Sequence, residues 1–167
     1  MPGSGLLDTQ VNWIEWAHQL IATDDPDEVV VEFIGNDGLL GAQPGIADGT
    51  TQFYERWRMA AQFLEDVPAS RGAQVYWVIG PPLATPSNEA KVTTLDSIYE
   101  SLHAPNDASG RPPIINVVNA FSAPNGAYSE YLPGPDGTFV QMRLPDGIHF
   151  TSAGIARYAD IVAHMLE

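Results

Sequence analysis

Cysteine is absent from the 167 residues of this chain. Its absence excludes a disulfide scaffold, a zinc site built on thiolates and a cysteine nucleophile, although it identifies no cellular compartment. Basic residues are scarce, because 7 Lys and Arg stand against 21 Asp and Glu, which gives a net charge of -14 and a pI near 4.3. A surface this negative repels phosphate backbones and anionic lipids, so nucleic-acid and membrane-surface partners are disfavoured.

Long apolar runs are missing as well. No stretch approaches the roughly 18 apolar residues of a membrane-spanning helix, and no basic start followed by an apolar stretch indicates a signal peptide. The sequence therefore predicts a soluble acidic protein without a membrane span, and it leaves the localisation open between cytoplasmic and secreted. The four histidines are scattered, so no metal site built from them is expected.

The residues that are present favour a packed core. Hydrophobic residues make up 44% of the chain and charged residues 17%, a balance that disfavours wholesale disorder. Domains commonly run to about 100–200 residues, and the chain contains no repeat and no linker long enough to divide it. We therefore expect a single domain over residues 1–167.

Strand-like and helix-like segments alternate along the chain. Apolar residues recur at helical spacing, or as short β-branched runs, between turn-forming residues. The predicted helices cover residues 11–22, 50–67, 89–103 and 152–166, and the predicted strands cover 28–34, 74–79 and 114–118, with an extended piece at 138–144. This alternation is typical of right-handed crossover units, and it predicts an α/β fold with a parallel sheet.

Two segments carry more specific packing predictions. The run Val29-Val30-Val31 indicates a strand buried on both faces, as in parallel sheets. The last helix is expected to face inward through Ile155, Tyr158, Ala159, Val162 and Leu166. Ligands bind outside the carboxyl ends of parallel strands, so we expect the chemistry in residues 35–49, 80–87 and 119–149.

The segment Asp146-Gly147-Ile148-His149 stands just before the last predicted helix. A turn made tight by Gly147 can bring the Asp146 carboxylate beside the His149 imidazole. A carboxylate on one ring nitrogen fixes the tautomer and leaves the other nitrogen as a base for a serine hydroxyl. The alternative interpretation is a turn aspartate and a surface histidine, because short motifs of this kind recur by chance.

A second polar group follows the first predicted strand, in Gly35-Asn36-Asp37-Gly38. An asparagine at this position can direct its side-chain amide into the cleft, where an amide donor can hold a developing oxyanion. The alternative is a plain turn, because Asn, Asp and Gly are the commonest turn formers.

Together these segments resemble the SGNH (GDSL-like) hydrolases. Residues 29–37 resemble the third conserved block of that family, and residues 146–154, Asp-Gly-Ile-His-Phe-Thr-Ser-Ala-Gly, resemble the fifth. Residues 76–82 look like the strand and loop between those blocks, and Gly3-Ser4-Gly5-Leu6 is similar to the second block. The resemblance spans nearly the whole chain, and the fifth block is its most specific part.

The resemblance implies a three-layer α/β/α sandwich with a flavodoxin-like parallel sheet. It makes His149 the general base and Asp146 the residue that orients it. It makes Asn36 the side-chain donor of the oxyanion hole and Gly5 the backbone donor. Members of the family hydrolyse esters of lipids, of small acyl groups and of acylated carbohydrates, or transfer acyl groups. The expected partner is therefore a small-molecule or glycan ester, and no metal or organic cofactor is expected.

The chain departs from the family pattern in two places. Gly35 precedes Asn36 directly, where the family usually has a residue between them. The Gly-Asp-Ser block that carries the nucleophile is absent, and Ser4 has no strand before it from which to project, so the nucleophile is unknown. We expect the chain to be the C-terminal portion of the full fold, truncated or degenerate, lacking the first strands and having little or no esterase activity.

Three further expectations follow from this interpretation. Without the first strands, the strand at 28–34 has an unpaired apolar edge, which favours self-association. One alternative function is a non-catalytic module on a degenerate hydrolase fold that binds a glycan or a protein. Another is acyl transfer to a polysaccharide, in which a sugar hydroxyl replaces water.

Overall fold

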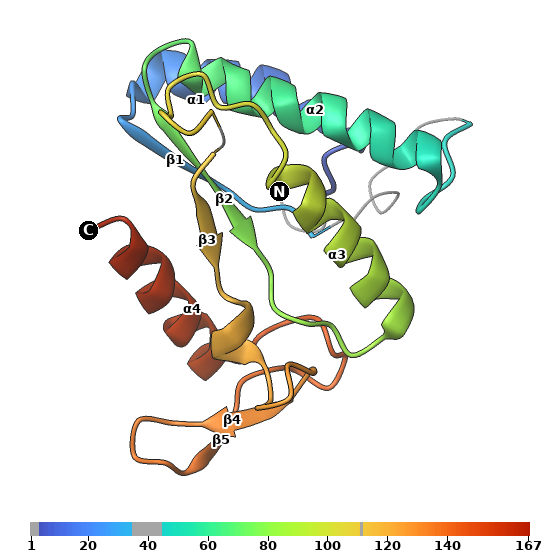
Figure 1. The fold of residues 1–167 in the computed structure, drawn as a ribbon, viewed down its shortest axis with the longest axis vertical. Helices are drawn as coiled ribbons and strands as arrows, with labels where there is room; N and C mark the ends of the chain where they lie inside the picture. Colours follow the sequence, from blue (N-terminus) through green and yellow to red (C-terminus); the bar gives the residue numbers. More distant parts are fainter. Residues whose placement is uncertain (1–3, 35–44, 111) are drawn as a thin grey trace. The chain divides into compact units, whose positions relative to one another are not determined.

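The computed structural model describes residues 4–34, 45–110 and 112–167 of the chain (Figure 1). The chain divides into two compact units. The first comprises Met1–Val78 and Lys91–Ile114, and the second comprises Ile79–Ala90 and Ile115–Glu167. The expectation of one domain over residues 1–167 stays a prediction.

A parallel sheet of three strands forms the centre of the predicted α/β fold. The strands are β1 (Glu28–Val31), β2 (Gln74–Ile79) and β3 (Ile114–Asn116), in the order β1-β2-β3. β1 pairs with β2 in parallel, with Val29 opposite Val75 and Val31 opposite Trp77. The prediction of an α/β fold with a parallel sheet is confirmed, and β2 has the predicted bounds.

The described residues contain four α-helices. They are α1 (Trp13–Asp24), α2 (Thr51–Ala69), α3 (Pro86–Tyr99) and α4 (Ser152–Met165). Side chains cap three of them, because Asn12, Thr50 and Thr151 each accept a hydrogen bond from a backbone N–H in the first turn. α3 begins at Pro86 and ends at Tyr99, earlier at both ends than predicted. No described helix has the length and apolar character that crossing a membrane requires.

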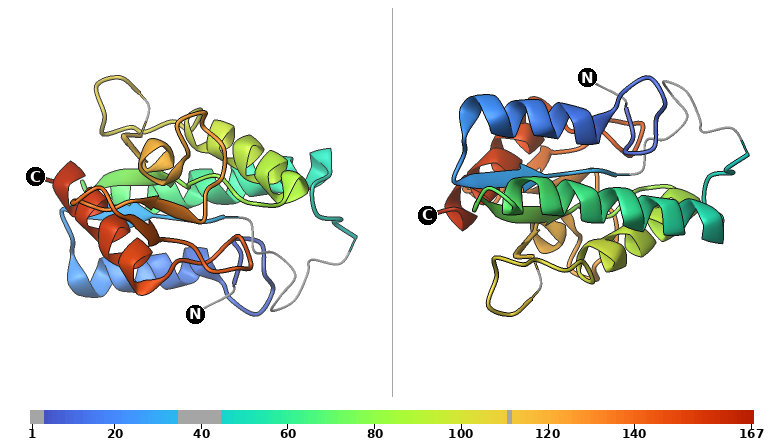
Figure 2. Two further views of the ribbon diagram at one scale, coloured as in Figure 1. Left: turned by 90° about the horizontal axis from the view of Figure 1, so that it is seen from below. Right: turned by 90° about the horizontal axis from the view of Figure 1, so that it is seen from above.

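Aromatic side chains dominate the core of the first unit. α1 packs against α2, and Figure 2 shows the two helices running alongside each other. The most deeply buried members of this core are Phe53, Trp57, Ala61, Val75, Trp77, Leu95 and Tyr99. The helical spacing of the α2 members and the alternation of the β2 members explain why the sequence predicted these elements.

One buried carboxylate interrupts this apolar core. Glu65 on α2 accepts a 2.8 Å hydrogen bond from the indole N–H of Trp77. The Trp77 ring stacks on the ring of Tyr99, with centroids 4.5 Å apart. The Tyr99 hydroxyl accepts a bond from the indole of Trp57 and donates one to the carbonyl of Phe33, just beyond β1. The polar groups of Glu65, Trp77, Tyr99 and Trp57 therefore have partners, as their desolvation requires.

β1 is more exposed than the sequence indicated. Its residues alternate between exposed and half-buried, and Val30 keeps 40% of its surface exposed, so the expectation of burial on both faces is wrong. The reason is its place at the edge of the sheet, where the described residues pair it only with β2. An apolar groove of about 560 Å³ lies beside it, lined mainly by α1 and β1. Self-association through this edge stays a prediction.

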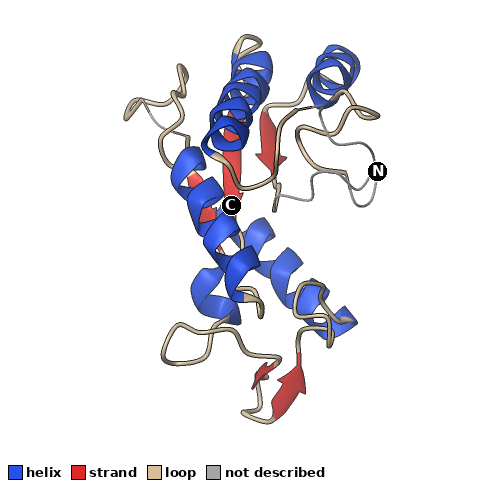
Figure 3. Cartoon of the chain, turned by 90° about the vertical axis from the view of Figure 1, so that its right-hand side faces the viewer, coloured by secondary structure: helices blue, strands red, loops and turns tan. Residues whose placement is uncertain are grey.

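The second unit contains a short 3-10 helix and a hairpin that the sequence did not predict as such. The 3-10 helix spans Val118–Phe121. β4 (Tyr131–Pro133) and β5 (Phe139–Gln141) pair in antiparallel fashion as a separate two-stranded sheet (Figure 3). Residues 138–144 were expected to be extended, and β5 occupies the first part of that range.

α4 differs from its predicted packing. The helix begins at the predicted residue and is capped by Thr151, but Ile155, which was expected to face inward, keeps 59% of its surface exposed. Ala159 is exposed as well, and the buried residue of the helix is Gly154. The helix contacts the rest of the unit at its first turn and again at its second, where the Tyr158 ring packs against Phe121 and Phe150.

Candidate active site

The segment between β5 and α4 folds into a tight turn that brings Asp146 and His149 together. The N–H of Gly147 donates to the carbonyl of Leu144 at 3.0 Å, and the N–H of Leu144 donates to the carbonyl of His149 at 2.7 Å. Gly147 has a φ of +73°, which a residue without a side chain adopts readily. The turn therefore depends on the glycine at its centre.

A single carboxylate serves three donors in this turn. Oδ1 of Asp146 accepts the backbone N–H groups of Ile148 and His149, at 2.8 and 2.9 Å. Oδ2 lies 2.9 Å from Nδ1 of the His149 ring. The bonds from His149, backbone first and side chain second, together with the bond from Ile148, lower the pKa of Asp146 to about 2.

The low pKa of Asp146 determines how the imidazole is used. An ionised carboxylate is only an acceptor, so Nδ1 of His149 carries the proton that lies between the two groups. In the neutral imidazole this leaves Nε2 unprotonated and able to accept a proton. The side chains of Asp146 and His149 are 45% and 68% exposed, so the imidazole that carries Nε2 is accessible to solvent.

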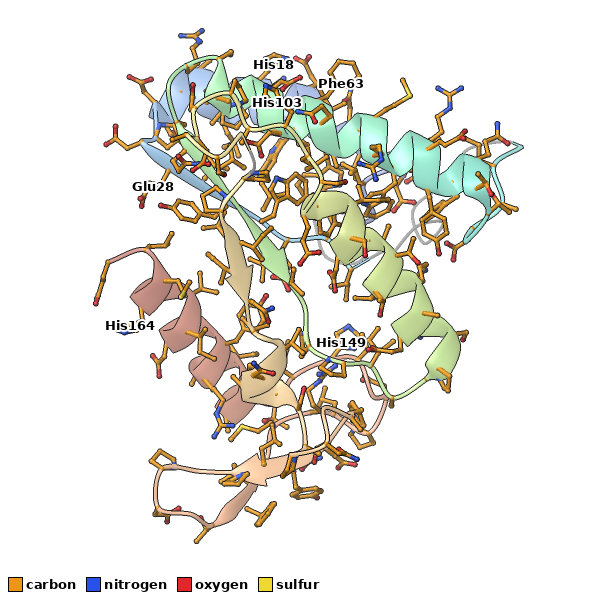
Figure 4. The ribbon with its side chains drawn as sticks, viewed as in Figure 1. His18, Glu28, Phe63, His103, His149 and His164 are labelled. Atoms are coloured by element: carbon orange, nitrogen blue, oxygen red, sulfur yellow. The ribbon has the colours of Figure 1, made fainter. Side chains whose placement is uncertain are left out.

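A second histidine and carboxylate pair provides a comparison. His164 Nδ1 lies 3.4 Å from Glu167 at the end of α4, and both side chains are more than three-quarters exposed. Figure 4 labels His149 and His164 in different parts of the chain. In the part of the chain that the structure describes, Glu167 accepts no backbone N–H, so its pairing with His164 lacks the support that Asp146 has.

The other predicted site residues belong to the first unit or lie outside the described residues. Asn36, the predicted side-chain donor, falls in the range that is not described. Gly5 is buried, and its N–H donates to the carboxylate of Asp8 at 2.8 Å, while the N–H of Asp8 donates back to the Gly5 carbonyl at 3.2 Å. Ser4 is half-buried next to it. The structure therefore joins Asp146 to His149, and the backbone donor predicted at Gly5 already has an acceptor.

Sequence reasoning missed Arg143, which lies in the same segment of the second unit. Its side chain has no exposed surface, and it donates to the carbonyls of Gly147 and Ile148, directly before His149. A single arginine between the apolar residues Met142 and Leu144, in a chain with few basic residues, was the only signal that could have marked it.

Among the described residues, no group of three or more His, Asp or Glu side chains is arranged to hold a metal ion.

Comparison with known proteins supplies the fold and a family. A family model described as "Protein of unknown function (DUF459)" matches residues 2–165. No curated protein matches the chain. Among solved structures, a candidate acylhydrolase from Bacteroides fragilis is 14% identical, with a TM-score of 0.62 over 98% of this chain and 70% of the other. A protein named TesA is 18% identical, with a TM-score of 0.60 over 96% of this chain and 73% of the other.

Identities this low establish the fold and not the reaction. The likeness extends over nearly the whole chain, and it shows that the chain shares the fold of these two proteins, as the resemblance to the SGNH hydrolases predicted.

Proposed function

The chain belongs to the DUF459 family, and from this membership, its SGNH-like fold and its paired Asp146 and His149 we propose that it carries the general base of a serine ester hydrolase. One observation carries the proposal. His149 Nδ1 lies 2.9 Å from a carboxylate whose other oxygen is held by two backbone N–H groups. This arrangement supports a fixed tautomer of the imidazole, which a base for a hydroxyl group needs.

In the proposed reaction, a serine hydroxyl attacks the carbonyl carbon of an acyl ester while its proton passes to Nε2 of His149. Asp146 stabilises the imidazolium that forms, and the side-chain amide of Asn36 donates to the negatively charged oxygen of the tetrahedral intermediate. The imidazolium returns the proton to the departing alcohol. A water molecule that gives a proton to His149 then attacks the acyl carbonyl, and the imidazolium returns that proton to the serine oxygen as the carboxylic acid leaves.

Two components of this reaction limit what the chain does by itself. No Gly-Asp-Ser sequence occurs in the chain, so the serine is not assigned. The N–H of Gly5 donates to Asp8, so Gly5 joins the oxyanion site only when that bond opens. We expect little or no turnover from the chain alone, because a site without its nucleophile keeps only a small part of the rate.

The proposed substrates are carboxylic esters and O-acyl carbohydrates. Acyl transfer to a polysaccharide uses the same acyl-serine and replaces water with a sugar hydroxyl. Analysis of the products from an acetylated oligosaccharide separates the two, because hydrolysis releases acetate and transfer yields a new ester.

The test is the release of p-nitrophenol from p-nitrophenyl acetate by the wild type, His149→Ala and His164→Ala. His164→Ala is the matched control, because it removes an exposed imidazole that also lies near a carboxylate. We expect at most a small rate, which His149→Ala abolishes and His164→Ala leaves in place. A measurable rate in the wild type that His149→Ala leaves unchanged would contradict the proposal.

Two other results would change parts of the proposed function. A burst of p-nitrophenol that disappears in His149→Ala would reveal a nucleophile within the chain, with Ser4 the first serine to replace. The expectation of low activity would then be wrong, while the reaction class would stand. Binding of an acetylated oligosaccharide without turnover, unchanged by replacement of Asp146 or His149, would favour the non-catalytic binding module.

A further inference from the structure

Arg143 is buried beneath the turn that holds Asp146 and His149. Its side chain has no exposed surface. Nη1 donates to the carbonyl of Pro82 at 3.1 Å, and Nη2 donates to the carbonyls of Ile148 at 2.9 Å and Gly147 at 3.4 Å. The guanidinium thus lies against the segment after β2 and against the two residues that precede His149.

The surroundings of this guanidinium are unusual for a buried charge. Among the described residues, no carboxylate lies within ion-pair distance of Arg143. Aromatic rings supply part of the electrostatic stabilisation that a carboxylate would give. The guanidinium carbon lies 4.7 Å from the Phe150 ring centroid and 5.4 Å from that of Tyr128. Burial lowers the pKa of Arg143, and the nearby Tyr128 and Asp146 oppose that shift. A charge with so few ionic partners is costly to bury, so its stabilisation depends on the hydrogen bonds to the three carbonyls.

The same two peptide groups are bound from both sides. The carbonyl of Gly147 and the N–H of Ile148 belong to one planar peptide group, and the carbonyl of Ile148 and the N–H of His149 belong to the next. Arg143 binds the two carbonyls, while Oδ1 of Asp146 accepts the two N–H groups. Fixing the carbonyls therefore fixes the direction of the amides that hold the carboxylate.

We propose that Arg143 is a positioning residue, which sets the two peptide planes that aim the Asp146 carboxylate at Nδ1 of His149. The role depends on the planar fork of arginine, because one guanidinium reaches three carbonyls in different directions, whereas an ammonium is a single donor centre. Its catalytic meaning rests on the proposed function, but the geometry it controls can be measured without turnover.

The test reads the tautomer of His149 by long-range ¹H–¹⁵N NMR at alkaline pH, where free imidazole is neutral. The resonance is assigned by its loss in His149→Gln. We expect the wild type to hold His149 mainly as the Nδ1–H tautomer. Arg143→Met and Arg143→Lys are expected to lose most of that preference, because the Ile148 carbonyl loses the guanidinium and the Gly147 carbonyl keeps only the N–H of Ala84, 3.2 Å away.

Arg157→Met is the matched control. Arg157 is half-buried in the same unit and also donates to carbonyls, those of Ala120 and Pro133, but it makes no bond to the turn. We expect its replacement to leave the His149 tautomer unchanged. If Arg143→Lys and Arg143→Met fold and keep the wild-type tautomer, the proposal is overturned.

If the Arg143 variants do not fold, a second measurement tests whether Arg143 is coupled to the turn that holds Asp146 and His149. Solvent exchange of the Arg143 Nη protons is followed in the wild type and in Asp146→Ala, which removes the acceptor of the Ile148 and His149 N–H groups. Loosening the turn should weaken the bonds to Gly147 and Ile148 and accelerate this exchange on the order of tenfold. Unchanged exchange would overturn the proposal.

The outcomes for Arg143 and for the enzyme are separate. A wild type with an intact Nδ1–H tautomer and a measurable rate of hydrolysis that His149→Ala leaves unchanged contradicts the proposed function and leaves the positioning role of Arg143 in place. Hydrolysis that depends on His149 but a tautomer indifferent to Arg143 contradicts the positioning role alone.

Discussion

The Asp146 carboxylate accepts two backbone N–H groups through Oδ1 and faces the imidazole through Oδ2. The two oxygens therefore have different roles, because Oδ1 stabilises the turn and Oδ2 selects the tautomer of His149. A substitution that keeps one oxygen and replaces the other by a donor separates these roles, and asparagine has that composition.

Asp146→Asn is expected to keep the turn and reverse the tautomer of His149. The amide oxygen can accept the N–H groups of Ile148 and His149, while the amide nitrogen faces Nδ1 and donates to it. Nδ1 then becomes an acceptor, and Nε2 carries the proton and can no longer act as a base. The change is read from the ¹H–¹⁵N spectrum, and any His149-dependent hydrolysis should fall by a factor on the order of 10³–10⁴.

The control for this substitution is Asp160→Asn, an exposed position on α4. It removes the same charge without touching the turn, so the His149 spectrum should stay that of the wild type. A wild-type tautomer in Asp146→Asn would mean that the carboxylate does not select it.

At this scale, the sequence predicted local pairs better than distant ones. Asp146 and His149 are three residues apart, and the glycine between them allows a tight turn, so their pairing was one of two interpretations that the spacing left open. The bond from Gly5 to Asp8 is equally local but was not predicted, because nothing in the composition of residues 4–8 distinguishes a free amide from one with an acceptor. Arg143 was missed because its partners are backbone carbonyls, which the sequence does not reveal.

Among the elements, α4 is fixed to its unit at its first turn. Thr151 caps the helix by accepting the N–H of Gly154, and its hydroxyl donates to the carbonyl of Gln141 at 2.7 Å. The N–H of Thr151 donates to the carbonyl of Met142 at 3.0 Å. A β-carbon on Gly154 would lie 2.1 Å from that same carbonyl oxygen and 3.0 Å from the Phe150 ring. The helix start and the end of β5 therefore approach too closely for a side chain.

Gly154→Ala tests this approach, because two effects predict opposite signs. Helix propensity alone predicts that alanine stabilises an interior helical position by about 1 kcal/mol relative to glycine. The overlap with the Met142 carbonyl is with backbone, which cannot move aside cheaply, so we expect a loss of roughly 2–4 kcal/mol in the free energy of unfolding. Urea denaturation measures the difference.

Ser152→Ala in the same turn is the control for that experiment. Its side chain is exposed, so its replacement should change the free energy of unfolding by less than about 0.5 kcal/mol. A Gly154→Ala variant as stable as the wild type would show that the first turn of α4 can shift to accept a methyl group.

The elements that were predicted well have long or repeated patterns. α2 presents apolar residues at helical spacing over 19 residues, and β2 is a six-residue apolar run closed by Gly80-Pro81-Pro82. The β4–β5 hairpin was not predicted, because strands of three residues are too short to show alternation. The inward face of α4 was predicted wrongly at Ile155, because a periodic pattern shows that a face is apolar but not that another element covers it.

At the scale of the whole molecule, alternation of strands and helices was enough to predict the fold class, because crossover connections leave few arrangements for such a chain. The candidate site was less accessible to prediction. Of the residues predicted for it, Gly5 belongs to the first unit and Asn36 lies outside the described residues. The reaction class therefore rests on the pair in the second unit.

The core of the first unit contains a titratable group that couples stability to pH. Burial of Glu65 raises its pKa to about 7 from 4.5, against the opposing effect of the Trp77 hydrogen bond, and Asp66 adds a smaller upward shift. The folded protein thus holds this proton more tightly than the unfolded chain does. The resulting stabilisation is fully present below pH 4.5 and is lost as the pH rises through 7.

Glu65→Gln is expected to remove this dependence. Glutamine keeps an oxygen that can accept the Trp77 N–H, and it carries no charge. The free energy of unfolding of the variant should therefore exceed that of the wild type by roughly 2–3 kcal/mol above pH 7, and the two values should approach each other near pH 5. Urea denaturation across this pH range measures the two free energies of unfolding. The other carboxylates are the same in both proteins, so their effect cancels when one value is subtracted from the other. Glu55→Gln, at an exposed position on the same helix, should give a nearly constant difference. Parallel curves for the wild type and Glu65→Gln would mean that Glu65 is ionised in the folded core at neutral pH.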